Sequence, residues 1–308
     1  MLSKVAERIY WSARYLERIE STARLVNVYA NLLLDLPKGV QMGWYNLVLL
    51  NSLEEPFKER YKNQDERNVI KFLLGDENNP GSIVTSLSAL RENLRTTRDV
   101  IPAESWEMIN ELNIFVSENI PKAVKRGDRP DVLEGIIRGC QSINGLLYGT
   151  MSHDEAWDFL RLGRNLERAD MSTRILDAGC FALLETQDEE AAVNVWQIVW
   201  GNVLRSVGAQ QSYRRKLRRS VKGRVVAEYL LEDQEFPRAI KHCLQAMVDS
   251  TKKLPHNGDV LSKIEEMRNR NFKDVDYSDL GQPMRDYLNT LQIELGGIHS
   301  AIAKQWFD

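Results

Sequence analysis

Two stretches of the sequence, 150 positions apart, decide the fold. Residues 15–26 read YLERIESTARLV, and residues 165–176 read NLERADMSTRIL. In both stretches apolar residues recur at steps of three, four and seven, the pattern of a helix with one buried face. The offset is constant, so Arg14 aligns with Arg164, Glu17 with Glu167 and Arg24 with Arg174. We therefore interpret the stretches as two copies of one helix and expect them to meet.

The charged residues of each copy share one helix face. At about 100° per residue, Arg14, Glu17, Glu20 and Arg24 fall within roughly 120° of arc, with apolar residues around them. Such an island is either a solvated stripe or a partly buried network, and its occurrence in both copies favours the network. We expect carboxylates and guanidiniums to balance, because an unpaired buried charge is costly. The candidate site, the Glu–Arg cluster, comprises Arg14, Glu17, Arg18, Glu20, Arg24, Arg164, Glu167, Arg168, Asp170 and Arg174.

A second repeated block extends the duplication. Residues 67–83, RNVIKFLLGDENNPGSI, align with residues 224–240, RVVAEYLLEDQEFPRAI, with identities at seven positions. Average composition would give roughly one identity by chance. The sequence therefore predicts two copies of one unit, about 1–150 and 151–308. With no Ser-, Pro- or Gly-rich linker between them, we expect one domain over 1–308, in which the copies pack with pseudo-twofold symmetry.

The rest of the chain also has helical character. No proline or glycine occurs from Leu2 to Leu36, so we predict one long helix there, ended by residues 37–39. Pro80 opens a helix near Ser82, and the Ser-x-x-Glu spacing of Ser152 and Glu155 predicts a capping box. No stretch shows sustained strand-type alternation. The predicted fold class is all-α, a long antiparallel helical bundle built from an internal duplication.

Composition limits the setting of the protein. The chain has 308 residues and a net charge of −3, and no apolar run approaches the roughly 18–20 residues that span a bilayer. Lys4, Glu7 and Arg8 lie in an amphipathic pattern, unlike a secretory signal. The three cysteines are far apart in apolar helical contexts, typical of small buried side chains. We expect a cytoplasmic protein with no membrane association.

Signatures of metal and nucleophile chemistry are missing from the sequence. None of the four histidines follows an acidic residue by three positions, and there is no Cys-x-x-Cys pair. Neither a Gly-x-Ser-x-Gly motif nor a P-loop occurs. We therefore predict no metal and no cofactor, and assign no catalytic residue.

A basic stretch is the second candidate site. Residues 213–224, YRRKLRRSVKGR, hold seven basic residues and no acidic one. They form either a solvated helix end or a surface for an anion or acidic partner. Nucleic acid is disfavoured by the slightly negative net charge and the lack of a known motif. The corresponding part of the first copy is mixed in charge, which suggests a use beyond packing. The basic residues are Arg214, Arg215, Lys216, Arg218, Arg219, Lys222 and Arg224.

The sequence resembles a known family through residues 10–26, YWSARYLERIESTARLV, and 159–176, FLRLGRNLERADMSTRIL. This is the bacterial alpha-E family, a helical domain of unknown function with a Glu-Arg motif. The resemblance covers the whole chain and carries over Glu17, Arg18, Glu167 and Arg168. Members are typically encoded beside, or fused to, a circularly permuted ATP-grasp protein, often with a transglutaminase-like peptidase. The resemblance implies a role in making or modifying amide-linked or peptide products.

Two functions remain open at this stage. The chain is either a helical partner subunit of an ATP-grasp ligase, or an enzyme that uses the Glu–Arg cluster as acid, base and carboxylate clamp. An acid–base role needs a carboxyl group with a raised pKa, whereas neighbouring arginines lower the pKa. The residues therefore favour the subunit.

Overall fold

The computed structural model describes residues 1–36, 43–184, 189–270, 272, 275–277 and 279–308. All regular structure in these ranges is helical, which confirms the predicted all-α class. The helices are α1 (Ser3–Asp35), α2 (Asn46–Leu50), α3 (Glu54–Arg60), α4 (Glu66–Gly75), α5 (Ile83–Arg95), α6 (Ala103–Ala123), α7 (Arg129–Thr150), α8 (Glu155–Leu184), α9 (Glu189–Ser206), α10 (Gln210–Leu217), α11 (Gly223–Glu232), α12 (Ile240–Thr251), α13 (Gly258–Asn269) and α14 (Gln282–Trp306).

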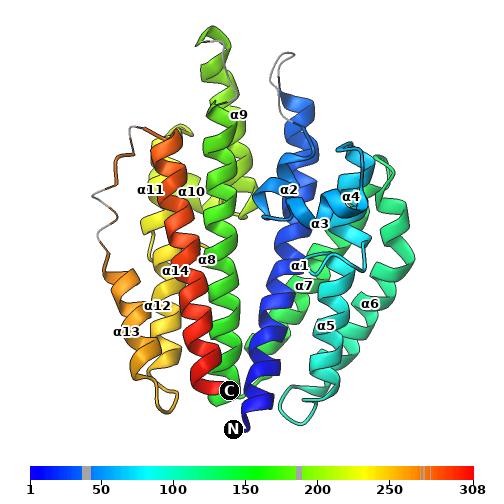
Figure 1. The fold of residues 1–308 in the computed structure, drawn as a ribbon, viewed down its shortest axis with the longest axis vertical. Helices are drawn as coiled ribbons and strands as arrows, with labels where there is room; N and C mark the ends of the chain where they lie inside the picture. The colour runs from blue at the N-terminus through cyan, green and yellow to red at the C-terminus, as the bar shows by residue number, and fades with distance from the viewer. Residues whose placement is uncertain (37–42, 185–188, 271, 273–274, 278) are drawn as a thin grey trace.

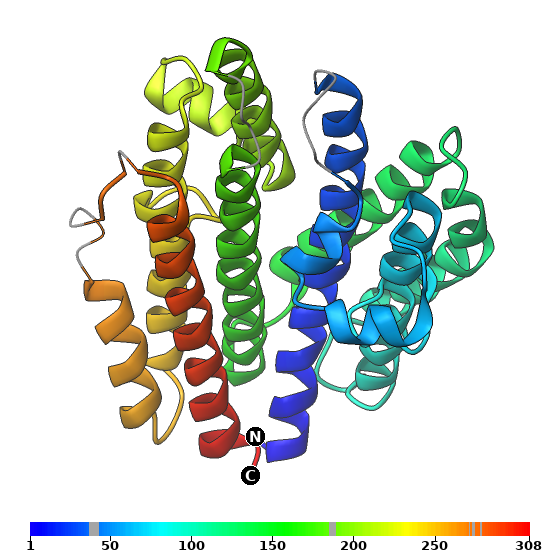
Figure 2. The same ribbon diagram turned by 45° about the horizontal axis from the view of Figure 1, so that its top comes forward.

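The helices form two wings that meet at a central pair (Figures 1 and 2). Helices α1–α7 make up one wing and α8–α14 the other, and α1 packs directly against α8. Both chain termini lie at the same end of the molecule (Figure 1). The two central helices run in the same direction, because positions of equal rank in the two sequence stretches meet across the joint. Glu17 contacts Arg168, and Arg18 contacts Glu167.

Each wing surrounds its central helix in the same order. Helix α1 packs on α5 and α7, with α6 outside them, and α8 packs on α12 and α14, with α13 outside them. Helices α7 and α14 run antiparallel to the central helix of their own wing (Figure 1). The duplication itself stays a prediction, and this shared order of packing is what it would produce.

Local sequence explains the long first helix. With no helix breaker inside it, α1 continues for 33 residues and buries side chains around most of its circumference, Glu17 and Glu20 among them. It ends at Asp35, close to the expected stop, although residues 37–39 themselves lie outside the described ranges.

Two helix starts test the capping predictions. At α5 the Ser82 side chain accepts a hydrogen bond from the backbone N–H of Thr85, as the proline before it suggested. At α8 the predicted capping box of Ser152 is wrong. The Asp154 carboxylate caps this helix instead, accepting from the N–H groups of Ala156 and Trp157 at 3.0 and 3.3 Å. An acidic cap is also favoured by the positive end of the helix dipole.

The three cysteines are buried and unpaired in the core, as their apolar contexts predicted. Burial raises the pKa of the Cys180 and Cys243 thiols to about 12, so neither is a reactive thiolate at neutral pH. In the part of the chain that the structure describes, no helix is both long enough and apolar enough to cross a membrane.

The two central helices approach closely at Gly163 of α8. A Cβ atom at this position would overlap the backbone carbonyl oxygen of Tyr10 in α1. Neither backbone can move aside, because both helices are buried along this edge. Glycine is therefore required here for the close contact between helices rather than for an unusual backbone conformation.

We predict that Gly163→Ala destabilises the protein by about 2–3 kcal/mol, since the overlap outweighs the better helix propensity of alanine. Chemical denaturation measures the change. Gly145→Ala in α7, where a Cβ meets nothing within 4 Å, is the matched control and should be neutral or slightly stabilising. Equal stability of the two variants would show that α1 and α8 are not in close contact.

Candidate functional site

The Glu–Arg cluster lies at the middle of the joint between α1 and α8. Side chains from the two helices pair across it, so the expectation that the two charged stretches meet is confirmed. The glutamates are almost completely buried, with Glu17 1% and Glu167 2% exposed. The cluster is thus a partly buried network and not a solvated stripe.

Glu167 is held from the opposite helix by two arginines. Its carboxylate accepts from Arg14 Nε at 2.8 Å and from Arg18 Nε at 2.6 Å. Burial alone would raise the pKa of Glu167, but Arg18 and Arg14 outweigh burial and lower the pKa to about 2. Glu167 is therefore ionised at any physiological pH.

Glu17 is held from the second wing in a related way. It accepts from Arg168 Nε at 2.9 Å and from Arg238, which lies just before α12. Burial opposes ionisation of Glu17 as well, yet Arg168, Arg238 and the nearby Arg164 lower its pKa. Arg18–Glu167 and Arg168–Glu17 are thus reciprocal pairs across the joint.

The outer acidic residues of the cluster pair mainly with arginines. Glu20 accepts from Arg24 at 2.8 Å and from Arg238 at 2.9 Å, and Asp170 accepts from Arg174 at 2.8 Å. Arg174 also donates to the backbone oxygen of Leu50 at 3.2 Å, which ties α8 to the turn after α2. Every carboxylate of the cluster therefore has a guanidinium partner.

Arg238 is a functional residue of the cluster that sequence reasoning missed. It aligns with Gly81 of the first copy, so the repeat carries no sign of it. It lies between helices, where helical periodicity cannot place it on a face. Its backbone oxygen accepts from Ser172 Oγ at 2.7 Å, which fixes the loop against α8. In the sequence, the only feature that distinguishes Arg238 is its position directly after Pro237, which aligns with Pro80.

Arg164 is the member that the network leaves unpaired. It aligns with Arg14, but Arg168 and Arg238 occupy the oxygens of Glu17 that Arg164 would otherwise reach. Among the described residues no acceptor lies within hydrogen-bonding distance of its buried Nη2 atom. Its guanidinium stands 5.7 Å from the Trp157 ring centre, and burial together with Arg168 lowers its pKa to about 10.

The charges of the cluster do not balance, contrary to our expectation. The predicted members already include more arginines than carboxylates, and Arg238 adds a further guanidinium. The neighbouring arginines lower the pKa values of Glu17 and Glu167 and so keep these two carboxylates ionised. An ionised carboxylate whose oxygens accept from arginines is poorly suited to donate or remove a proton. The arginines are Arg14, Arg18, Arg24, Arg164, Arg168, Arg174 and Arg238, against Glu17, Glu20, Glu167 and Asp170.

The basic stretch covers the end of α10, the turn after it and the start of α11. Arg218 ends α10 in a left-handed conformation, with φ of 47°. Lys216 pairs with Asp233 at 2.7 Å and with Glu235 at 3.0 Å. The other six basic side chains are exposed and have no ion pair within the described residues. Lys216 is thus paired within the protein, and the other six basic side chains remain open to a partner or an anion.

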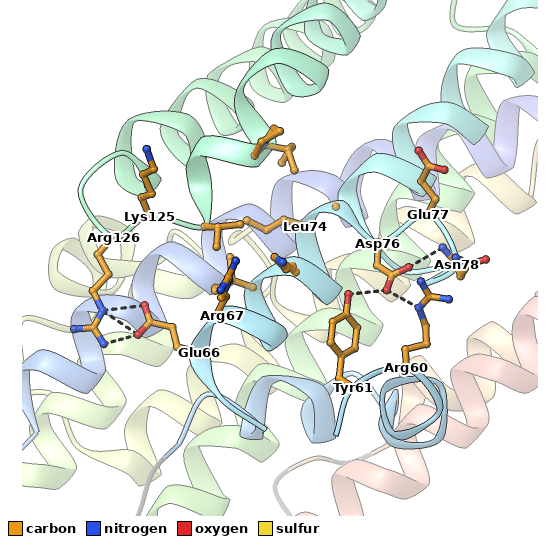
Figure 3. A pocket seen from close by; sticks show the side chains of 16 residues that line it. Arg60, Tyr61, Glu66, Arg67, Leu74, Asp76, Glu77, Asn78, Lys125 and Arg126 are labelled. Atoms are coloured by element: carbon orange, nitrogen blue, oxygen red, sulfur yellow. Dashed lines mark hydrogen bonds and ion pairs between the residues drawn. The ribbon is translucent and has the colours of Figure 1, made fainter. Parts of the chain in front are cut away.

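A groove between α4 and α6 was not predicted from the sequence (Figure 3). It has a volume of about 930 Å³. One end is closed by Glu66 paired with Arg126 at 2.5 Å, and the other by Asp76 paired with Arg60 at 2.7 Å. We call it the α4–α6 groove. No sequence motif indicates it, because α6 is brought beside α4 only by the packing of the wing.

Metal ligation has no support in the described ranges, where no group of three or more His, Cys, Asp or Glu side chains is arranged to hold an ion. The Glu–Arg cluster also lacks the geometry, since arginines occupy its carboxylates.

The fold and the cluster together define a class of protein, an all-helical molecule whose wings are joined by reciprocal Glu–Arg pairs. The chain belongs to the Alpha-E family, described as a predicted alpha-helical domain with a conserved ER motif, which it matches over residues 1–307.

Relatives occur in mycobacteria. The chain is 24% identical over 192 residues to an uncharacterised protein of Mycobacterium bovis and to one of Mycobacterium tuberculosis, and 23% identical to one from a second M. tuberculosis strain. Each alignment covers 58% of this chain but only 20% of the relative, so the chain spans a small part of the length of these proteins. No solved structure matches the chain significantly.

Removing one buried carboxylate should be far more damaging than removing the unpaired arginine. Glu167→Ala leaves Arg14 and Arg18 without their shared partner, and we expect a loss of about 3–5 kcal/mol in the free energy of unfolding. Arg164→Met removes no pairing and should change stability by less than about 1 kcal/mol. Denaturant titration tests both, and an unchanged melting temperature for Glu167→Ala would mean that the pairs contribute no net stability.

Acid should selectively remove the contribution of Glu167. Its pKa is lowered on folding, so its stabilisation is complete above the unfolded-state pKa of about 4.3 and is lost as the pH falls towards 2. The stability difference between the natural protein and Glu167→Gln should therefore shrink between about pH 5 and pH 2. Urea titrations across this range measure it, and a constant difference would contradict the lowered pKa.

Proposed function

We propose that the protein is a non-catalytic partner subunit that works with an ATP-grasp ligase in an amide- or peptide-forming pathway. The observation that carries this proposal is the saturation of the Glu–Arg cluster. Its four carboxylates are held by arginines, and the pKa values of Glu17 and Glu167 are lowered. Such a centre is a rigid joint between two wings, which a scaffold or subunit needs and an acid–base catalyst does not.

The lengths of the relatives support a module that acts with other domains. In the mycobacterial proteins the matching region makes up only 20% of the chain. A helical domain within a much longer protein has neighbours with which to cooperate. The family resemblance supplies the identity of the proposed partner, a circularly permuted ATP-grasp protein, and adds a transglutaminase-like protein as a second one.

The basic stretch offers a surface for such a partner. Arg214, Arg215 and Arg218 are exposed and lie on α10 and at its C-terminal end, in the second wing. A cluster of one charge attracts an acidic partner and speeds its association, and salt weakens the effect. The surface is rigidly based, because Tyr213 is buried beneath it and Lys216 is anchored to Asp233.

The alternative, an enzyme of the same pathway, would use the Glu–Arg cluster directly. It would need Glu17 or Glu167 to hold a proton near neutral pH, and both have lowered pKa values. It would also need access for a substrate, but both side chains are buried. The subunit is therefore the better-supported proposal.

Binding to the neighbouring ATP-grasp protein should depend on the basic stretch and on salt. We expect the triple variant Arg214→Glu, Arg215→Glu, Arg218→Glu to weaken association at least about tenfold. Surface plasmon resonance at several salt concentrations measures this, alongside amine-dependent ATP consumption by the mixture. The control reverses three exposed lysines elsewhere, Lys62, Lys263 and Lys304, and should bind normally.

One result would overturn the subunit proposal in favour of the enzyme alternative. If the chain alone converts a pathway intermediate, and Glu167→Gln abolishes turnover while the protein stays folded, then the cluster is catalytic. Circular dichroism on the same sample establishes whether the variant is folded.

A further inference from the structure

The α4–α6 groove has the length of a short extended peptide. It follows α4 from Glu66 at the first turn to Asp76 just beyond the last. Helix α4 has 10 residues, or roughly 15 Å at 1.5 Å per residue. An extended chain advances about 3.3 Å per residue, so four to five residues fill this length.

The bed of the groove is apolar. Ile70 and Leu74 of α4 and Ile120 of α6 lie at its base, and all three are buried. Pro121 and Val124 add accessible apolar surface on the α6 side. The two helices are in tight contact here, since a Cβ at Gly75 would lie 2.9 Å from the Ile120 side chain. The groove is therefore shallow and has a firm base.

Unpaired cations stand along both walls. Arg67 and Lys71 both line the groove and lie one turn apart on α4. Lys125 lies across from Arg67 on the α6 side (Figure 3). All three are exposed, and none has a carboxylate within 4.0 Å among the residues that the structure describes. The acidic residues Glu66 and Asp76 are already neutralised by arginines. Glu77 also lines the groove and is exposed, so three cations and one carboxylate are left open to a ligand, and the open charge is mainly positive.

The spacing of the cations fits alternate carboxylates. Side chains four residues apart on a helix stand about 5–6 Å apart at Cβ. Side chains on one face of an extended peptide are two residues apart, which is roughly 6–7 Å. Two carboxylates at alternate positions can thus reach Arg67 and Lys71 together. The intervening side chains would then face the other way, towards the apolar surface of α6.

A second groove in the other wing has the opposite charge. It lies against α11, has about 470 Å³, and is lined by four acidic but only two basic residues, whereas the α4–α6 groove has five basic and three acidic. Both are bordered by a corresponding ion pair, Arg60–Asp76 and Lys216–Asp233. At the aligned position, Lys71 of one groove is replaced by Glu228 of the other. The positive charge of the α4–α6 groove is therefore not a feature shared by both grooves of this kind in the molecule.

We propose that the α4–α6 groove binds an acidic peptide segment in extended conformation, with carboxylates at alternate residues paired to Arg67 and Lys71. Apolar side chains between those carboxylates contact Val124 and Pro121. This inference does not rest on the proposed function, because the groove lies in the first wing and the basic stretch in the second.

Fluorescence anisotropy with synthetic peptides tests the assignment. The probe is a fluorescein-labelled hexapeptide of alternating leucine and glutamate. One comparison peptide has glutamine for glutamate, and another has the same composition in two blocks. We expect saturable binding of the alternating peptide, at least about tenfold weaker binding of the block peptide, and none of the glutamine peptide.

Protein variants then locate the binding. Arg67→Glu with Lys71→Glu should weaken it at least about tenfold, and the neutral pair Arg67→Gln with Lys71→Gln by less. Both positions are exposed, so the melting temperature should not change, and the neutral pair remains informative if the charge reversal fails to fold. Arg214→Glu with Arg215→Glu is the matched control and should bind the peptide normally.

The same measurements can overturn the proposal. Binding that is lost only in the Arg214 and Arg215 variant would place the peptide on the basic stretch. Equal binding of the alternating and block peptides would contradict the extended conformation with carboxylates at alternate residues. The absence of saturable binding would show that the groove is not a peptide site. Because the ATP-grasp experiment uses different residues, its failure and failure of this proposal are distinguishable.

Discussion

The structure depends on a set of charges that must be buried together. Glu17 and Glu167 lie in the joint between the wings, where an unpaired carboxylate would be very costly. Each is stabilised by arginines from the other wing, so neither wing can satisfy its own glutamate at this position. The joint is therefore specific as well as stable, because sliding α1 along α8 by one turn would separate Arg18 from Glu167 and Arg168 from Glu17.

The two sides of the joint are similar but not equivalent. Glu167 uses two arginines of α1, whereas Glu17 uses Arg168 and an arginine from a loop, Arg238. Because Arg238 takes this place, Arg164 is buried beside Trp157 without an acceptor for its Nη2 atom among the described residues. The excess of positive charge explains why the glutamates remain ionised despite their burial. It also makes an acid–base role for the cluster chemically unfavourable.

The outer surfaces of the two wings also differ. Corresponding ion pairs border a positive groove in one wing and a negative groove in the other. The exposed basic stretch belongs to the second wing alone. The reciprocal Glu–Arg pairs of the interior are thus combined with grooves of opposite charge in the two wings.

Helical periodicity in the sequence was sufficient to predict helices, since helical faces repeat within a few residues. The repetition of the charged stretch predicted that its two copies meet. The repeated stretch, with the Glu-Arg motif of the family, identified Arg18 and Arg168 together with their glutamates. Arg238 and the α4–α6 groove could not be predicted in this way. The first lies in a loop, and the second is formed by two helices, α4 and α6, between which the chain passes through α5. Their positions follow from how the helices pack, which depends on long-range contacts that no local pattern encodes.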